Sequence, residues 1–217
     1  MTTTRVTPVY DAVTIDRARR LGTATLHEAA GRIGALPSAI SAITPGQDFA
    51  GPAVTVSGPP ADNLWLHRGI AAADLGEILL IEVGGHFESG YWGEVMAVAA
   101  RARGVAGVVI DGCVRDSEAL ATVGVPVYAR GLCIRGTDKD PDGRGAVNGP
   151  VTIGDVTVHS GDLVVGDADG VVVIPAGDVD HVLDAAQQRI DREAQIMDAL
   201  RRGENSIDLL NLPKEKP

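Results

Sequence analysis

The sequence predicts an α/β fold built from parallel βαβ units, with a C-terminal amphipathic helix. Two observations support this fold class. Short runs rich in valine and isoleucine alternate with helical segments of about ten residues. The chain also has 27 glycines, which permit tight turns between the elements. Strands that are joined through helices of this length pair in parallel. Aromatic residues make up only 3% of the chain, so we expect an aliphatic core.

The first two thirds of the chain alternate between helical and extended patterns. A helical pattern from Val13 to about Ile33 is broken near Gly22, and Thr25 and Glu28 have the spacing of a capping box. The later elements are a strand at 49–58, a helix at 63–74 capped by Asp62, a strand at 77–83, a glycine-rich loop at 84–93, a helix at 94–104, a strand at 105–110, a short helix at 116–124 and a strand at 125–130.

The pattern changes after residue 136. A turn-rich loop at 136–150 precedes short strands at 151–175, which favour antiparallel or mixed sheet. A charged amphipathic helix runs from about Gly177 to Arg202, and a polar tail follows it. With 217 residues the chain is long enough to bury one core, and we expect a single domain, 1–217.

Composition excludes several classes of function. The net charge is −10 and the sequence pI is about 4.8, with no cluster of lysine and arginine, so nucleic-acid binding is not expected. The two cysteines, Cys113 and Cys133, have no metal-site or disulfide-rich spacing, which favours a reduced cytoplasmic protein. No apolar run approaches the length of a membrane span, and the N-terminus has no signal-peptide pattern.

Two consecutive strand-to-helix corners hold the residues best suited to chemistry. Ligands collect at the carboxyl ends of parallel strands, so the loop at 84–93 and the segment 111–116 should face one crevice. Glycines in the first corner allow backbone N–H groups at a helix start to meet an anion. In the second, Arg115 suits a bidentate grip on a carboxylate, and Asp116 can supply oxygen to Mg²⁺ or Mn²⁺. The alternative is a surface turn, with a helix-start aspartate beside a solvated arginine.

The lysines and histidines give weaker evidence of a reactive site. The three lysines are Lys139, Lys214 and Lys216, and none follows an apolar strand, so a Schiff-base mechanism is not expected. The five histidines lack metal-ligand spacing. Of these, His67 on the helix after "ADNLW" is expected to be a packed or capping residue rather than a catalytic one.

The segment "GYWGEVMAVAARARGVAGVVIDGCVRD" resembles the signature of the family of class II 4-hydroxy-4-methyl-2-oxoglutarate/4-carboxy-4-hydroxy-2-oxoadipate aldolases, which also holds the regulator of ribonuclease activity A. The signature is an acidic residue, twenty residues and then Arg-Asp, here Glu94 and Arg115-Asp116. Further matching stretches are "LGTATLHEAAGRIG", "FAGPAVTV", "ADNLWLH" and "GDLVVGDADGVVVIP". The resemblance implies a layered α/β/β sandwich, assembled as a homotrimer or as a hexamer of two trimers.

The resemblance also implies roles for single residues. Arg115 would grip the 2-oxo acid, Asp116 would bind the divalent metal directly or through water, and Glu94 would hold water on the metal. An acidic residue on the C-terminal helix of a neighbouring subunit would approach the metal; we assign Glu193, with Asp191 in reserve. The part of the chain that packs on that neighbour would be about 177–217. Substrate would also meet the backbone of Gly93, Glu94, Val95 and Met96.

The implied reaction is a metal-dependent retro-aldol cleavage that releases pyruvate, with Mg²⁺ or Mn²⁺ as electron sink. Oxaloacetate decarboxylation should accompany it, because both reactions form the pyruvate enolate. Two alternatives stay open. One is a non-catalytic regulator that binds ribonuclease E. The other is a dedicated oxaloacetate decarboxylase, or a lyase for another pyruvate-yielding acid. The older label of menaquinone methyltransferase finds no glycine motif to support it.

Overall fold

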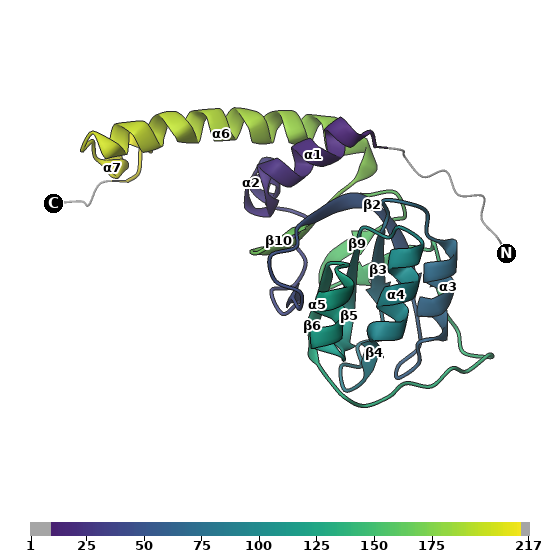
Figure 1. Ribbon diagram of the computed structural model, residues 1–217. Coiled ribbons are helices and arrows are strands. Elements are labelled where there is room, and N and C mark those ends of the chain that lie inside the picture. The colour runs from purple at the N-terminus through teal and green to yellow at the C-terminus, as the bar shows by residue number, and fades with distance from the viewer. Residues whose placement is uncertain (1–9, 214–217) are drawn as a thin grey trace.

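The computed structural model describes residues 10–213, and its centre is a twisted parallel sheet (Figure 1). Aliphatic residues in near-continuous runs form these strands, as expected for strands that are covered on both faces. Neighbouring pairs are parallel, with Ala53 opposite Ile78 and Ile78 opposite Gly107. The strands, in spatial order, are β6 (Val127–Leu132), β5 (Gly107–Val114), β3 (Ile78–Glu82) and β2 (Phe49–Ser57).

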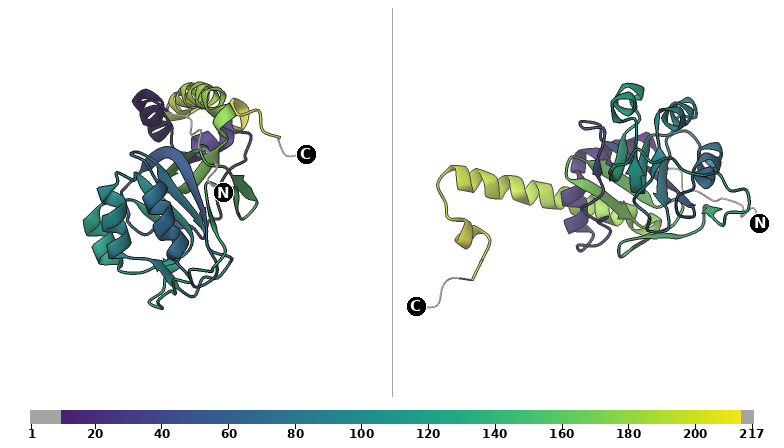
Figure 2. Two further views of the ribbon diagram at one scale, coloured as in Figure 1. Left: turned by 90° about the vertical axis from the view of Figure 1, so that its right-hand side faces the viewer. Right: turned by 90° about the horizontal axis from the view of Figure 1, so that it is seen from below.

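Three helices cover one face of this sheet, as the βαβ pattern predicts (Figures 1 and 2). Their apolar stripes meet the sheet in a core that includes the fully buried Trp92 and Leu66. Each helix connects two parallel strands, so the start of each lies near the carboxyl edge of the sheet. They are α3 (Leu64–Ala72), α4 (Glu94–Ala102) and α5 (Ser117–Val123).

The sheet curls around its other face. β2 continues into antiparallel pairing with β10 (Leu163–Asp167), which pairs with β11 (Gly170–Ile174), so nine strands within residues 10–213 form one strongly curled, nearly closed sheet. A second apolar core fills its interior, and the two-stranded sheet of β8 and β9 contributes to that core. The remaining strands are β1 (Ser41–Ala42), β4 (Gly90–Trp92), β7 (Ala146–Val147), β8 (Val151–Ile153) and β9 (Val156–Val158).

A third core lies outside β10 and β11, where three helices pack on the sheet. They are α1 (Ala12–Leu21), α2 (Thr23–Ala29) and the first half of α6 (Val179–Arg201), which follows the short helix η1 (Ala176–Asp178). The predicted capping box at Thr25 and Glu28 is wrong, because α2 already begins at Thr23. Instead, the Asp167 carboxylate on β10 accepts hydrogen bonds from the Thr23 amide (2.7 Å) and hydroxyl (2.6 Å).

The second half of α6 extends away from the body, and α7 (Ser206–Leu209) folds back beside its end (Figures 1 and 2). Apolar side chains on this arm are exposed: Met197, Leu200, Ile207, Leu210 and Leu212. The predicted tail is described only as far as Pro213, because residues 214–217 lie outside the described part, as do residues 1–9. Within residues 10–213, no helix combines the length and the apolar character needed to span a membrane.

The predicted fold class is confirmed: a mixed α/β fold with parallel βαβ units, and a C-terminal helix close to the predicted range. The two β layers are portions of one curled sheet. Several boundaries differ from the prediction by a few residues, and two of the differences lie near the site. β5 continues through Asp111 to Val114, because it pairs with β6 and β4 beyond Ile110. The glycine-rich loop at 84–93 contains β4, which pairs in parallel with β5.

Loss of the Asp167 carboxylate should destabilise the fold. In Asp167→Ala the amide and hydroxyl of buried Thr23 lose their acceptor. We expect the free energy of unfolding to fall by about 1–3 kcal/mol, as for other buried donors left unpaired. Urea unfolding of both proteins measures the difference. Asp169→Ala, at an exposed position in the same turn, is the control and should change stability by less than about 0.5 kcal/mol.

Candidate functional site

The two predicted corners are adjacent because β4 inserts beside the end of β5. Gly90 pairs with Cys113, and the Arg115 amide donates to the Trp92 carbonyl at 2.9 Å. The start of α4 therefore lies directly beside Arg115 and Asp116. The sequence placed both corners at one crevice from strand order, and the structure brings them into hydrogen-bond contact.

The loop before β4 is fixed by an ion pair and a stacked ring. The Arg130 Nε on β6 lies 2.6 Å from the Asp111 Oδ1 on β5, and both side chains are largely buried. The same guanidinium lies over the Phe87 ring, 4.2 Å from its centre. Because Phe87 belongs to the loop that leads into β4, this cluster holds the first corner against the strands that carry the second.

Gly93 is the point of closest approach between the corners. A Cβ atom at this position would lie 2.4 Å from the Asp116 Oδ2 and 3.3 Å from the Arg115 Cγ. The Gly93 backbone is extended, with φ of −151°, so the requirement for glycine is one of space and not of conformation. Any side chain here would displace the pair from the start of α4.

Asp116 has an unusual backbone for a residue with a side chain. It lies in the left-handed region, at φ 60° and ψ 39°, as the residue before α5. Its carboxylate does not cap α5. The Oδ2 atom instead accepts a hydrogen bond from the Glu94 amide of α4 at 3.1 Å and lies 3.8 Å from the Arg115 Nε. The aspartate therefore joins the two corners, which a simple surface turn does not require.

The start of α4 offers backbone donors. The Glu94 amide is taken by Asp116 and the Met96 amide by the Gly93 carbonyl, at 3.1 Å. Among the described residues, the amides of Gly93 and Val95 have no acceptor. Two of the four predicted backbone contacts therefore remain available to an anion. The Val95 side chain is 79% exposed, and Met96 is buried in the core.

A pocket of about 230 Å³ opens beside these donors, and it includes residues that the sequence did not single out as site residues. Arg115, Asp116 and the start of α4 line it. Asn63 and His67 at the start of α3 and Lys139 from the turn-rich loop also line it. Asn63 and His67 have the i, i+4 spacing of one helix face, so that spacing was a usable signal. Nothing in the local sequence marks Lys139.

The charge of this pocket is positive on the Lys139 side. Burial, and in second place the Lys139 ammonium, lower the pKa of His67 below its ordinary value. His67 is therefore a neutral imidazole at neutral pH, able to donate or accept one hydrogen bond. Arg115 and Lys139 are the pocket's two permanent cations, and Asp116 is its anion. The predicted capping or packing role of His67 leaves out this exposure to the pocket.

A wider cleft of about 700 Å³ lies on the other side of Arg115 and Asp116. Its wall includes Glu94 and the segment after β6, where Leu132 is 60% exposed and Ile134 is 92% exposed. Arg115 and Asp116, with side chains 46% and 44% exposed, stand between the pocket and this cleft. The pair is thus reachable from two sides.

Glu193 lies elsewhere. It is on the extending half of α6, where its Oε1 is 2.8 Å from the Arg189 Nε, and Figure 1 places α6 at the opposite end of the molecule from β4. Asp191 accepts a hydrogen bond from Gln187 at 3.0 Å on the same helix. Within residues 10–213, no group of three or more potential ligands among His, Cys, Asp and Glu is assembled for a metal. One chain alone therefore does not bring Glu193 to Arg115.

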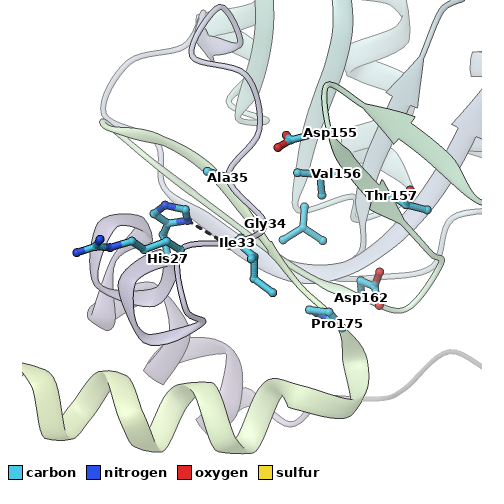
Figure 3. A pocket seen from close by; sticks show the side chains of 11 residues that line it. His27, Ile33, Gly34, Ala35, Asp155, Val156, Thr157, Asp162 and Pro175 are labelled. Carbon is cyan, nitrogen blue, oxygen red and sulfur yellow. Dashed lines mark hydrogen bonds between the residues drawn. The ribbon is translucent and has the colours of Figure 1, made fainter.

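Another cavity, of about 340 Å³, lies between α2 and the β8–β9 turn (Figure 3). Its buried carboxylate, Asp162, already accepts hydrogen bonds from the amides of His159 (2.8 Å) and Ala176 (3.0 Å). The His27 ring is bound to the Ile33 carbonyl at 3.1 Å. These polar groups hold the local fold, so the pocket beside Arg115 is the stronger candidate for chemistry.

Removal of the Lys139 charge should raise the pKa of His67. In Lys139→Met the second cause of the depression is gone, while the larger cause, burial, remains. We expect a partial return towards the ordinary value of about 6.5. NMR titration of the His67 ring measures it. Arg144→Met removes an exposed cation from the same loop and serves as the control. An equal shift in both variants would contradict the placement of Lys139 beside His67.

Comparison with known proteins identifies the family of this chain. The profile of the RraA-like family, described as Aldolase/RraA, matches residues 7–173. A relative from Halalkalibacterium halodurans, named "Putative 4-hydroxy-4-methyl-2-oxoglutarate aldolase", is 34% identical over 182 residues, covering 83% of this chain and 86% of the relative.

Solved structures show the same fold. An uncharacterized protein from Pseudomonas syringae pv. tomato has a TM-score of 0.82 at 28% identity, covering 98% of this chain and 99% of that one. RraAS2 from Streptomyces coelicolor, described as an unusual member of the RNase ES inhibitor RraA protein family, has a TM-score of 0.77 at 26% identity, covering 87% and 97%. The chain therefore belongs to the RraA-like family.

Proposed function

We propose that the protein is a divalent-metal-dependent lyase of the cytoplasm. It would cleave 4-hydroxy-4-methyl-2-oxoglutarate or 4-carboxy-4-hydroxy-2-oxoadipate by a retro-aldol reaction to release pyruvate, and it would also decarboxylate oxaloacetate. The observation that carries the proposal is the convergence of Arg115, Asp116 and the free amides of α4 on one pocket. The names of the aldolase relatives support it.

The pocket suits an acid with more than one carboxylate. The 2-oxo acid end would lie against the Arg115 guanidinium and the free amides of Gly93 and Val95, which together favour a carboxylate. A second carboxylate would face Lys139 and His67. Two cations in one pocket match the substrates named above, each of which carries a carboxylate away from the pyruvate unit.

The donors fit Mg²⁺ or Mn²⁺. Asp116 uses one carboxylate oxygen for the Glu94 amide and keeps Oδ1 for a ligand, and the Glu94 side chain lies in the adjoining cleft. Hard cations of this size take oxygen ligands, retain several waters and often need only one or two protein carboxylates. When bound, the metal would act as a Lewis acid that draws electron density from the 2-oxo group.

The protein's residues would manage charge and protons around the breaking bond. As the C3–C4 bond breaks, its electron pair moves onto the pyruvate part, and Arg115 would neutralise the negative charge that develops there. The proton of the C4 hydroxyl must leave, and Glu94, at the mouth of the site, is our candidate to carry it through water. Loss of CO₂ from oxaloacetate places the same charge at the same position.

We further propose that the protein works as a homotrimer or hexamer, in which a neighbour's Glu193 completes the site. Two sets of exposed apolar residues support contact between copies. One set is on the arm formed by α6 and α7, and the other is near Arg115: Val95, Leu132 and Ile134. Because the sets lie on different parts of the chain, pairing one with the other is a heterologous contact, which generates rings.

A second candidate function is a regulator that binds ribonuclease E without catalysis. The observation in its favour is the likeness to RraAS2 of the RNase ES inhibitor family over 87% of this chain. Such a protein would act through its surface, and substitutions at Arg115 would leave the interaction unchanged. Capture of ribonuclease E by the wild-type protein at moderate salt, with no pyruvate release from any tested acid, would favour this alternative.

Pyruvate release tests the enzyme directly. We expect release from 4-hydroxy-4-methyl-2-oxoglutarate and from oxaloacetate with Mg²⁺ or Mn²⁺, and loss of release with EDTA or in Asp116→Ala. Arg115→Ala should lower kcat/KM by at least a hundredfold, because the variant lacks the cation that would neutralise the developing negative charge. Each tenfold corresponds to about 1.4 kcal/mol of transition-state stabilisation. Ser117→Ala, at the position that follows Asp116, is the control. Equal activity of the Arg115→Ala protein would rule out its proposed role.

Mixed oligomers test the role of Glu193. Arg115→Ala and Glu193→Gln proteins should each be nearly inactive alone. Co-expressed in one oligomer, they should recover about a quarter of the wild-type sites, because random mixing pairs an intact arginine with a neighbour's intact glutamate at that frequency. Asp191→Asn in place of Glu193→Gln tests the reserve assignment. Full activity of both acidic variants alone would exclude the arm from the chemistry.

A further inference from the structure

The turn-rich loop is fastened to the start of α3 at several points. We call residues 136–145 the strap. The Asp138 amide donates to the Ala61 carbonyl at 2.8 Å, and the Asp138 carbonyl accepts from the Asn63 amide at 3.1 Å. Further along, the Trp65 Nε1 donates to the Gly143 carbonyl at 2.8 Å. The strap therefore lies along a fixed line beside the pocket.

Asp62 is the charged member of this attachment. Its residue is 3% exposed, and its two carboxylate oxygens have different partners. The Oδ1 atom accepts from the Leu64 amide at the start of α3 at 2.8 Å, and Oδ2 accepts from the Asp140 amide of the strap at 2.5 Å. The bond to the Leu64 amide agrees with the predicted role of Asp62 at the start of this helix. The bond to the Asp140 amide was not predicted, and it joins Asp62 to a segment more than seventy residues away.

Lys139 lies between the two fastened residues of the strap. The Asp138 backbone is bonded on one side and the Asp140 amide on the other, so the Lys139 backbone has little freedom. Lys139 lines the same pocket as Arg115. Its positive charge is the second cause, after burial, that lowers the pKa of His67.

We propose that Asp62 is a positioning residue, whose buried carboxylate pins the strap at Asp140 and thereby holds Lys139 in the pocket that Arg115 also lines. Its consequence for turnover rests on the proposed lyase function, while its consequence for the strap does not. An aspartate is required because the site presents two N–H donors to one short side chain. Asparagine offers one acceptor and one donor, so one of the two attachments is lost.

A lysine-specific endoprotease tests the pinning without any assay of activity. The chain has three lysines, and Lys139 is the one within residues 10–213. Cleavage there yields fragments 1–139 and 140–217, whereas cleavage after Lys214 removes only three residues and is told apart by mass. We expect Asp62→Asn to be cut after Lys139 at least about tenfold faster than wild type, because the released strap fits a protease site.

Two further variants make the proteolysis decisive. Asp155→Asn removes the same charge from an exposed turn, and its cleavage rate should equal that of wild type. Asp62→Ser keeps a short acceptor at the start of α3 and replaces Asp62→Asn if that protein does not fold. Circular dichroism confirms that each variant is folded before digestion. Unchanged cleavage after Lys139 in a folded Asp62 variant would overturn the proposal.

Kinetics separate positioning from a general loss of stability. With a dicarboxylate 2-oxo acid, Asp62→Asn and Lys139→Met should each raise KM about tenfold with little change in kcat, as expected when ground-state binding is lost. The double variant should be no worse than Lys139→Met alone, because Asp62 acts through Lys139. If the two increases in KM multiply in the double variant, Asp62 has a role that is independent of Lys139, and the proposal is wrong. If the wild-type protein releases no pyruvate, the lyase function fails, and the proteolysis still decides the role of Asp62.

Discussion

The close approach of Gly93 to Arg115 and Asp116 is the constraint on which the site depends. The absence of a side chain lets the start of α4 meet the Asp116 carboxylate, and that contact holds Asp116 in its left-handed backbone. Such a conformation costs a residue with a side chain about 1 kcal/mol, so the surrounding bonds must maintain it. Two backbone hydrogen bonds help to maintain it. The Arg115 amide donates to the Trp92 carbonyl, and the Leu120 amide donates to the Asp116 carbonyl.

Strand order made the centre of this site predictable, because parallel strands bring their carboxyl ends to one edge whatever the details of the loops. The association of the Gly93 corner with Arg115 followed from that rule. Local patterns were less secure. The first amide of α2 is bound by the Asp167 carboxylate, which is distant in sequence. The capping box predicted from the nearby Thr25 and Glu28 was therefore wrong. A cap supplied from another strand leaves no signal at the helix itself.

The Lys139 side of the pocket could not be predicted, because it depends on contacts between segments far apart in the chain. A loop of turn-forming residues carries no periodicity, and its course is set by Ala61 and Asp62, which precede α3, and by Trp65 on α3. The role assigned to Glu193 has the same character on a larger scale. In the proposed oligomer its position relative to Arg115 would depend on a second copy of the chain, which no pattern in a single sequence specifies.

The overall charge shows why the position of one lysine matters. A chain of net charge −10 repels anions at long range, so an anionic substrate gains nothing from the general field. At physiological ionic strength that repulsion is screened beyond about 8 Å, and the cations within the pocket dominate what a bound acid experiences. Attraction from Lys139 therefore acts only if its ammonium stands within that distance of the second carboxylate. If the proposed function holds, release of the strap would remove the Lys139 charge from the second carboxylate, so the bond between Asp62 and the Asp140 amide would serve the electrostatics of binding as well as the fold.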